Sequence, residues 1–104
     1  MEVRFFATAA GRSQPREFFS GLQAREKAFI AADLERLQKE GLKAPISKKP
    51  IKGHKPMWEV RTLAFRIFFV HHGDVFWVLH ICKKQDQRRG IEAAHTRMKE
   101  AIGR

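Results

Sequence analysis

The stretch Met57–Lys84 reads MWEVRTLAFRIFFVHHGDVFWVLHICKK, and it decides the fold. Val, Ile, Phe and Trp are frequent in it, and two short interruptions divide it into three segments. The pattern predicts antiparallel strands at Met57–Thr62, Phe65–His71 and Val75–Lys83. A two-residue connection joins the first two strands, and a turn in which Gly73 supplies a positive φ joins the last two.

The two-residue connection fixes the register of the first hairpin and places Arg61 opposite Arg66. Because side chains alternate along a strand, one face of the hairpin is wholly apolar and should pack on helices. The other face carries Glu59, Arg61, Arg66 and Phe68. Two opposed arginines repel each other, and Glu59 offsets only part of that repulsion. We interpret the pair as an anion-binding patch, because an oxyanion would relieve it; an Arg–Glu–Arg surface cluster is the alternative.

The turn between the second and third strands decides which lysine at the end of the stretch joins this patch. A two-residue turn places Lys83 on the face of Arg66, whereas an extra residue or a bulge places Lys84 there. The sequence leaves both registers open. The third strand should be central in the sheet and partly buried on both sides.

The single cysteine and the paired histidines carry no metal chemistry in our interpretation. Cys82 fits a small core residue, and one cysteine cannot form an internal disulfide, which favours a reducing cytoplasm. His71 and His72 are adjacent on a strand and therefore point in opposite directions, with no Cys or carboxylate constellation beside them. We predict no metal and no cofactor.

The flanking segments supply what such a sheet needs. Met1–Ala7 predicts a short edge strand, and Gln14–Ser20 predicts a helix with Ser13 as its N-cap. Gln23–Glu40 and Ile91–Ile102 carry apolar residues at helical spacing. The fold class is therefore α+β in a single domain, residues 1–104. A small antiparallel sheet, made of the N-terminal strand and the three-strand meander, packs against an N-terminal αα-hairpin, and a helix ends the chain.

Positive charge is concentrated in the second part of the chain. The formal net charge is +10; residues 1–40 hold seven Lys/Arg and six Asp/Glu, whereas residues 41–104 hold fourteen and five. This asymmetry predicts a polyanionic partner, with nucleic acid ahead of membrane. The segment Leu42–Pro56 is predicted to be a loop that tracks phosphates, and a solvated connector is the alternative. The candidate RNA-binding residues are Lys48, Lys49, Lys52, Lys55, Arg88 and Arg89.

The sequence resembles the RelE/ParE toxin superfamily, in particular its HigB-like, phage-derived branch. The resemblance is carried by GRSQPREFF, ERLQKEG, PIKG, WEVR, FRIFFV, VLHICKK and IEAAHTRMKE. It implies a cytoplasmic toxin of a type II toxin–antitoxin pair that cuts mRNA on the ribosome. It also implies a helix-turn-helix antitoxin as the partner, in a toxin–antitoxin hetero-oligomer. On matching positions, the family's phosphate-binding residues correspond to Arg61, Arg66, Lys83 and Lys84, and Glu59 falls on the acidic position.

The implied chemistry is RNA cleavage without metal, in which the 2′-OH attacks the phosphate. Arg61 and Arg66 suit the phosphorane oxygens, and Lys83 or Lys84 can add charge or protonate the leaving group. His54, in the basic loop, can swing onto a substrate. Glu59 is either a base or the residue that orients Arg61. Phe68 and Trp77 either stack a base or pack in the core.

Two departures from the family keep other functions open. The chain has no tyrosine, although many RelE-type enzymes carry one near the C-terminus, and the connection Asp86–Gly90 is short. A non-enzymatic gyrase inhibitor of the ParE type, acting through the αα-hairpin, is one alternative. A basic nucleic-acid-binding module is the other. Codon preference and the antitoxin's contact surface are left open.

Overall fold

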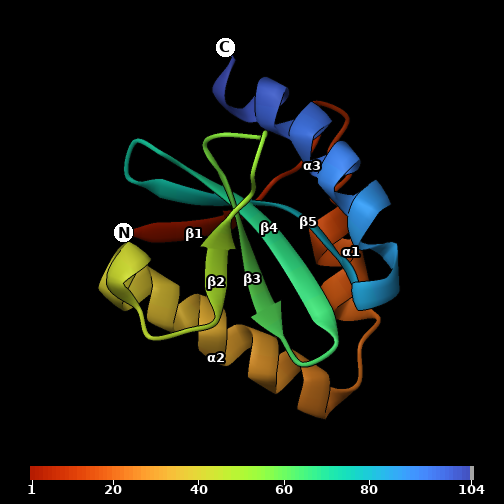
Figure 1. Cartoon of the computed structure of the whole chain (residues 1–104). Coiled ribbons are helices and arrows are strands. Elements are labelled where there is room, and N and C mark those ends of the chain that lie inside the picture. Colours follow the sequence, from red (N-terminus) through yellow and green to blue (C-terminus); the bar gives the residue numbers. More distant parts are fainter. Residues whose placement is uncertain (104) are drawn as a thin grey trace.

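The three strands of the opening stretch lie at the centre of a five-stranded sheet (Figure 1). The computed structural model describes residues 1–103. It places β3 at Met57–Thr62, β4 at Phe65–His72 and β5 at Val75–Lys83. Arg61 lies opposite Arg66, and the register predicted for the β3–β4 hairpin is confirmed.

Two short strands complete the sheet in the order β1-β5-β4-β3-β2. The N-terminal strand β1 (Glu2–Phe5) is an edge strand, as predicted, and it pairs in parallel with β5. The other edge is β2 (Lys48–Pro50), which pairs antiparallel with β3. The prediction that Leu42–Pro56 is loop throughout is therefore wrong at these three residues. None of their side chains is buried, so the strand carries no hydrophobic pattern.

Three α-helices cover the sheet: α1 (Gln14–Ser20), α2 (Ala24–Glu40) and α3 (Gln87–Ile102). A short 3-10 helix (Gly41–Lys43) follows α2, and another (Lys84–Asp86) precedes α3. The Ser13 hydroxyl accepts a hydrogen bond from the Arg16 N–H and caps α1, as predicted. Within residues 1–103, every helix is too short or too polar to cross a bilayer.

The helix α3 begins four residues before the predicted start at Ile91. Gly90 interrupts the sequence pattern there, but it lies inside the helix and is buried. A Cβ at this position would lie 2.7 Å from Cys82 Sγ and 2.9 Å from the Phe68 ring. Gly90 therefore permits a close approach between α3 and the sheet, which offsets its poor helix propensity.

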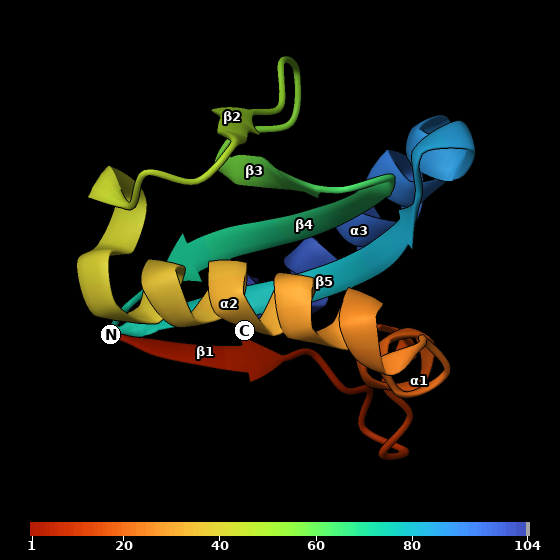
Figure 2. The same ribbon diagram turned by 90° about the horizontal axis from the view of Figure 1, so that it is seen from below.

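Helices α2 and α3 lie on opposite faces of the sheet (Figure 2). On the α2 side, Ile30, Leu34 and Leu37 pack with Val60, Ile67 and Phe69. On the α3 side, Phe68, Leu79 and Cys82 pack with Ala94 and Met98. The apolar face of the hairpin packs on a helix, as predicted. The face of Glu59 and Arg66 is also covered, by α3, so both of these charged residues are buried.

A β-bulge in the β4–β5 pair settles which lysine shares a face with Arg66. Phe68 lies opposite His80 and Phe69 opposite Val78, so Leu79 is the extra residue. Beyond the bulge, Phe65 lies opposite Lys83. The Lys84 N–H donates to Ala64 O at 2.7 Å. Lys84 therefore follows the register of the Arg66 face, and Lys83 belongs to the opposite face.

The free edge of β5 is completed by a side chain. Past the end of β1, the Gln14 amide donates to Ile81 O at 2.8 Å, and Gln14 Oε1 accepts from Ile81 N–H at 3.1 Å. These are the two bonds that a neighbouring strand would make. They also attach α1 to the sheet.

Candidate nucleic-acid interface

A buried carboxylate lies at the centre of the candidate interface. The Glu59 side chain is fully buried on β3. Glu59 Oε2 accepts a hydrogen bond from Arg61 Nε at 2.9 Å, and Oε1 accepts a short one from the Gln87 amide at the start of α3. The Arg61 side chain is 43% exposed. With both of its oxygens engaged, Glu59 is placed to orient the Arg61 guanidinium at the surface.

The opposing arginine is buried. Arg66 is 7% exposed, and its Nη1 donates to Phe65 O at 3.0 Å and to Leu63 O at 3.5 Å. Among residues 1–103, its Nε has no hydrogen-bond partner. An unsatisfied buried donor costs about 1–3 kcal/mol and calls for an explanation. Here the donor belongs to a cation that lies next to the cation of Arg61.

Lys83 and Lys84, at the end of the stretch Met57–Lys84, do not share one face of the sheet. Both are exposed. Lys83 lines a hollow on the α2 side with Phe18, Leu22 and Phe65. Only Lys84 lies on the same face of the sheet as Arg66, because its N–H bonds to Ala64 O and so continues the β4–β5 pairing.

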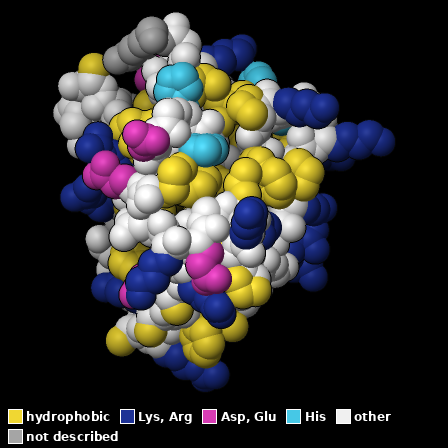
Figure 3. Space-filling view, turned by 90° about the vertical axis from the view of Figure 1, so that its left-hand side faces the viewer, with side chains coloured by type: hydrophobic (Ala, Val, Ile, Leu, Met, Phe, Trp, Pro, Cys, Tyr) yellow, Lys and Arg dark blue, Asp and Glu magenta, His cyan; other side chains and the backbone are white. Residues whose placement is uncertain are grey.

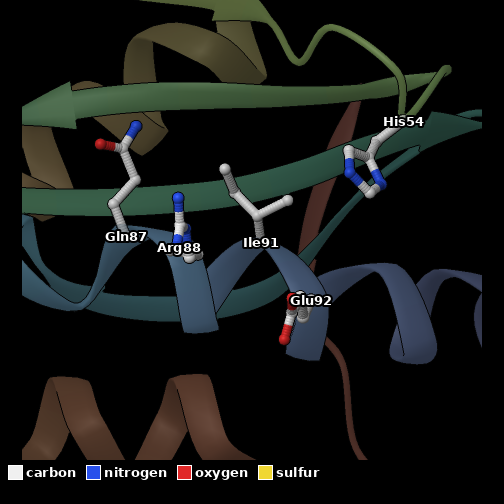
Figure 4. A pocket seen from close by; sticks show the side chains of 5 residues that line it. All are labelled: His54, Gln87, Arg88, Ile91 and Glu92. Carbon is white, nitrogen blue, oxygen red and sulfur yellow. The ribbon is translucent and has the colours of Figure 1, made fainter.

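His54 lies against α3 rather than free in the loop. Its Nδ1 is 3.2 Å from Nδ1 of His95, so one ring donates to the other. His54 also lines a pocket of about 320 Å³ with Gln87, Arg88, Ile91 and Glu92 (Figure 4). The four α3 residues of this pocket include Gln87, which binds Glu59. The pocket therefore adjoins the Glu59–Arg61 pair.

The lysine-rich segment Leu42–Pro56 lies on one side of the Glu59–Arg61 pair. Lys49 lies opposite Glu59 in the β2–β3 pair, whereas Lys48 lies opposite Val60 and donates to Ala44 O at 2.6 Å. Lys52 and Lys55 are exposed in the β2–β3 connection, which protrudes from the body of the molecule (Figure 2). Seen from the side that carries the N-terminus, Lys and Arg side chains project from both margins of the surface and are also scattered over the face between them (Figure 3).

The arginines at the start of α3 differ in their surroundings. Arg88 lines the pocket of His54, while Arg89 donates to Asp86 at 3.1 Å. The Gln87 amide reaches Glu59 on β3 because α3 starts at Gln87, four residues before the predicted start. Gln87 was missed as a site residue, since a glutamine in a predicted loop carries no signal.

A second polar pair lies under α3, away from Arg61. His80 stacks on Phe68, and its Nδ1 accepts from Arg97 Nη1 at 2.6 Å. Burial, with a smaller contribution from the Arg97 charge, lowers the pKa of His80 to about 4. Burial also lowers the pKa of Arg97 and raises that of the Cys82 thiol to about 11. The predicted core positions of Phe68 and Cys82 are confirmed.

This arrangement can hold a phosphodiester. Arg61 offers an oriented guanidinium, Arg66 adds a second positive charge beneath it, and the loop lysines extend the positive field. Within residues 1–103, no group of three His, Cys, Asp or Glu side chains is placed to hold a metal ion.

Comparison with known proteins places the chain in a family. No curated protein matches the chain. A chain in the crystal structure of the RelB–RelE antitoxin–toxin complex from Methanococcus jannaschii has the same fold, with a TM-score of 0.59 at 17% identity. The match covers 71% of this chain and 88% of that chain. The family model described as "Phage derived protein Gp49-like (DUF891)" matches residues 17–99, which is most of the sequence. The chain belongs to this phage-derived, Gp49-like family.

Proposed function

We propose that the chain is the HigB-like toxin of a type II toxin–antitoxin pair, and that it cuts mRNA on the ribosome without a metal. Membership of the phage-derived family and the fold shared with a RelB–RelE chain support this proposal. The observation that carries it is the opposition of Arg61 and Arg66, two cations that share the single carboxylate of Glu59, which binds only Arg61 among the described residues. The single negative charge of a phosphodiester offsets part of that repulsion, and the second charge that develops in the phosphorane offsets more.

In the proposed reaction, the 2′-OH attacks the adjacent phosphate, the 5′-oxygen leaves, and a cyclic phosphate remains. Arg61 and Arg66 stabilise the phosphorane oxygens, because guanidinium groups match phosphate geometry. Lys84, which follows the register of Arg66, is the lysine that adds charge there. His54 accepts the proton of the 2′-OH, Lys84 protonates the leaving 5′-oxygen, and Glu59 holds Arg61 in place.

The proposed partners follow from the same reaction. The substrate is mRNA in the ribosome, bound through the exposed lysines of the β2–β3 connection and Arg88. These contacts position the backbone and carry no sequence information. A helix-turn-helix antitoxin would hold the toxin inactive in the cytoplasm.

The test is controlled expression of the wild type and of Arg61→Ala, with mapping of mRNA ends and measurement of protein synthesis. We expect wild-type protein to arrest translation with cuts inside codons, and Arg61→Ala to lose both effects. Arg25→Ala is the matched control, since Arg25 is exposed on α2, where its guanidinium lies over the exposed Phe29 ring.

Circular dichroism of each variant separates lost activity from lost folding. Cuts at wild-type frequency with Arg61→Ala would contradict the proposed site. DNA damage with intact mRNA would instead identify a gyrase inhibitor. If the wild-type protein caused neither mRNA cleavage nor DNA damage, the remaining alternative would be a basic nucleic-acid-binding module.

A further inference from the structure

A second cation-lined cavity lies at the β1 edge of the sheet, while the Glu59–Arg61 pair lies towards the β2 edge. Its volume is about 360 Å³. It is formed by the segment after β1, the start of α1 and helix α3. The lining residues are Phe6, Thr8, Arg12, Gln14, Glu17 and Arg97.

Arg97 brings a partly desolvated cation to this cavity. Its side chain is half-buried, and burial lowers its pKa. Its Nη1 donates to the neutral His80 ring, which carries no negative charge. None of the ion pairs formed within residues 1–103 includes Arg97. The Glu100 carboxylate favours the Arg97 charge, but it forms no ion pair with Arg97 among the described residues. A partly desolvated cation without a carboxylate in contact is unfavourable, and an anion in the cavity would offset that cost.

The other polar groups of the cavity also favour an anion. The Arg12 guanidinium lies 3.6 Å from Glu17, and both side chains are mostly exposed, so this pair is weak. The Thr8 hydroxyl accepts from the Arg12 N–H at 3.2 Å, which leaves its own O–H to donate. Two guanidinium groups against one carboxylate leave the lining with a net positive charge.

We propose that this cavity is a second anion site, which binds a phosphoryl group between Arg97 and Arg12. A phosphate dianion offsets both guanidinium charges, and its oxygens accept from two planar forks and from the Thr8 hydroxyl. A carboxylate offers one charge and two oxygens. The phosphoryl group belongs either to free phosphate or to a small phosphate ester, which the cavity volume also admits. The site is independent of the proposed RNA cleavage.

His80 reports on this site from inside the protein. Its ring contacts Arg97 at 2.6 Å and does not line the cavity. A dianion on Arg97 partly neutralises the guanidinium charge that faces the ring. Filling the site should therefore raise the pKa of His80 from its value of about 4.

The experiment is an NMR titration of the full chain, which follows the His80 ring signals against pH and ligand. The probes are inorganic phosphate, adenosine 5′-monophosphate and acetate, each at an ionic strength matched with chloride. At about pH 7.5, where phosphate is a dianion, we expect saturable changes of the His80 ring signals with phosphate and much weaker binding of acetate. Near pH 4, where phosphate is a monoanion, the rise of the His80 pKa should be smaller but in the same direction. Tighter binding of the nucleotide would identify a phosphate ester as the ligand, and tighter binding of phosphate would identify the free ion.

Arg12→Gln is the decisive variant, because the Arg12 side chain is 79% exposed and its loss leaves the core intact. We expect it to weaken phosphate binding about tenfold or more, since it removes a charge-assisted contact. Arg97→Gln should abolish binding at this cavity, and Arg25→Gln should bind as the wild type does. A non-saturable response, equal binding by Arg12→Gln, or acetate binding as tight as phosphate would overturn the proposal.

Discussion

The carboxylate of Glu59 is fully buried, yet it holds the guanidinium of Arg61, which is partly in solvent, at 2.9 Å. A buried carboxylate is costly unless charged or polar donors satisfy it. The Gln87 amide supplies the second donor from α3. The pair therefore joins the interior of the protein to its surface, and it links the position of Arg61 to the docking of the last helix.

The first prediction concerns the charge of Glu59. Glu59→Gln keeps the shape of the side chain but removes the negative charge that binds Arg61. We expect the free energy of unfolding to fall by about 1–2 kcal/mol, less than for a fully buried pair because Arg61 is partly solvated. Chemical denaturation measures this. Glu35→Gln, in an exposed pair with Lys39, is the control and should change far less. Equal losses of unfolding free energy in both variants would show that the Glu59–Arg61 pair contributes no more stability than an exposed ion pair.

The second prediction assigns Gln87 a positioning role, which rests on the proposed function. Gln87→Met keeps the length of the side chain and removes the donor to Glu59. We expect mRNA cleavage to fall about tenfold, because one hydrogen bond that fixes Arg61 through Glu59 is lost. Gln85→Met is the control, since Gln85 is exposed nearby. If purified Gln87→Met cleaves ribosome-bound mRNA at the wild-type rate, Gln87 does not position Arg61.

The third prediction tests the close approach of α3 to the sheet. Alanine is a better helix former than glycine by about 1 kcal/mol, so Gly90→Ala would stabilise an isolated helix. In the folded protein we expect a net loss of about 1–3 kcal/mol, because the added methyl group overlaps Cys82 and Phe68. Thermal unfolding measures the difference. Gly21→Ala is the control, since its Cβ would meet only ordinary contacts at 3.7 Å. A stabilised Gly90→Ala protein would show that α3 can move outward freely.

The fourth prediction concerns stability at acid pH. The pKa of His80 is about 4 in the folded protein and is ordinarily near 6.5. Between these values the unfolded chain binds a proton that the folded protein does not, so stability falls as the pH drops. We expect roughly 1–2 kcal/mol of loss from this ring, allowing for solvent screening of a half-buried group.

Urea unfolding at intervals between pH 7 and pH 4 checks this. His80→Gln should flatten the part of the slope that this ring contributes. His72→Gln, at an exposed position, should keep the wild-type slope. An unchanged slope in His80→Gln would mean that other groups account for the whole pH dependence.

The central hairpin was predictable because two local rules agree there. A two-residue connection fixes the register, and the alternation from Trp58 to Phe69 assigns the faces. The bulge at Leu79 was not predictable, because it depends on how β5 fits between two strands and two layers. A single extra residue therefore decided between Lys83 and Lys84, and no local pattern marks it.

The candidate site was predictable in its residue types and less so in its surroundings. Glu59, Arg61 and Arg66 share a register, as the alternation indicated. The burial of Glu59 and Arg66 was not predicted, because Gly90 interrupts the helical pattern and the first turn of α3, which covers them, was therefore taken as loop. Gln87 and Arg97 could not be identified from sequence, because their roles depend on contacts with Glu59 and His80, which are far away in the sequence.

The two bonds from Gln14 to Ile81 have a consequence for self-assembly. A sheet grows by adding a strand to backbone groups that are still free, and Gln14 already occupies those of β5 beyond β1. At the other edge, β2 is only three residues long and ends in Pro50, which has no N–H to offer. The β2 border and the part of β5 beyond β1 are thus poor templates for a strand from another copy.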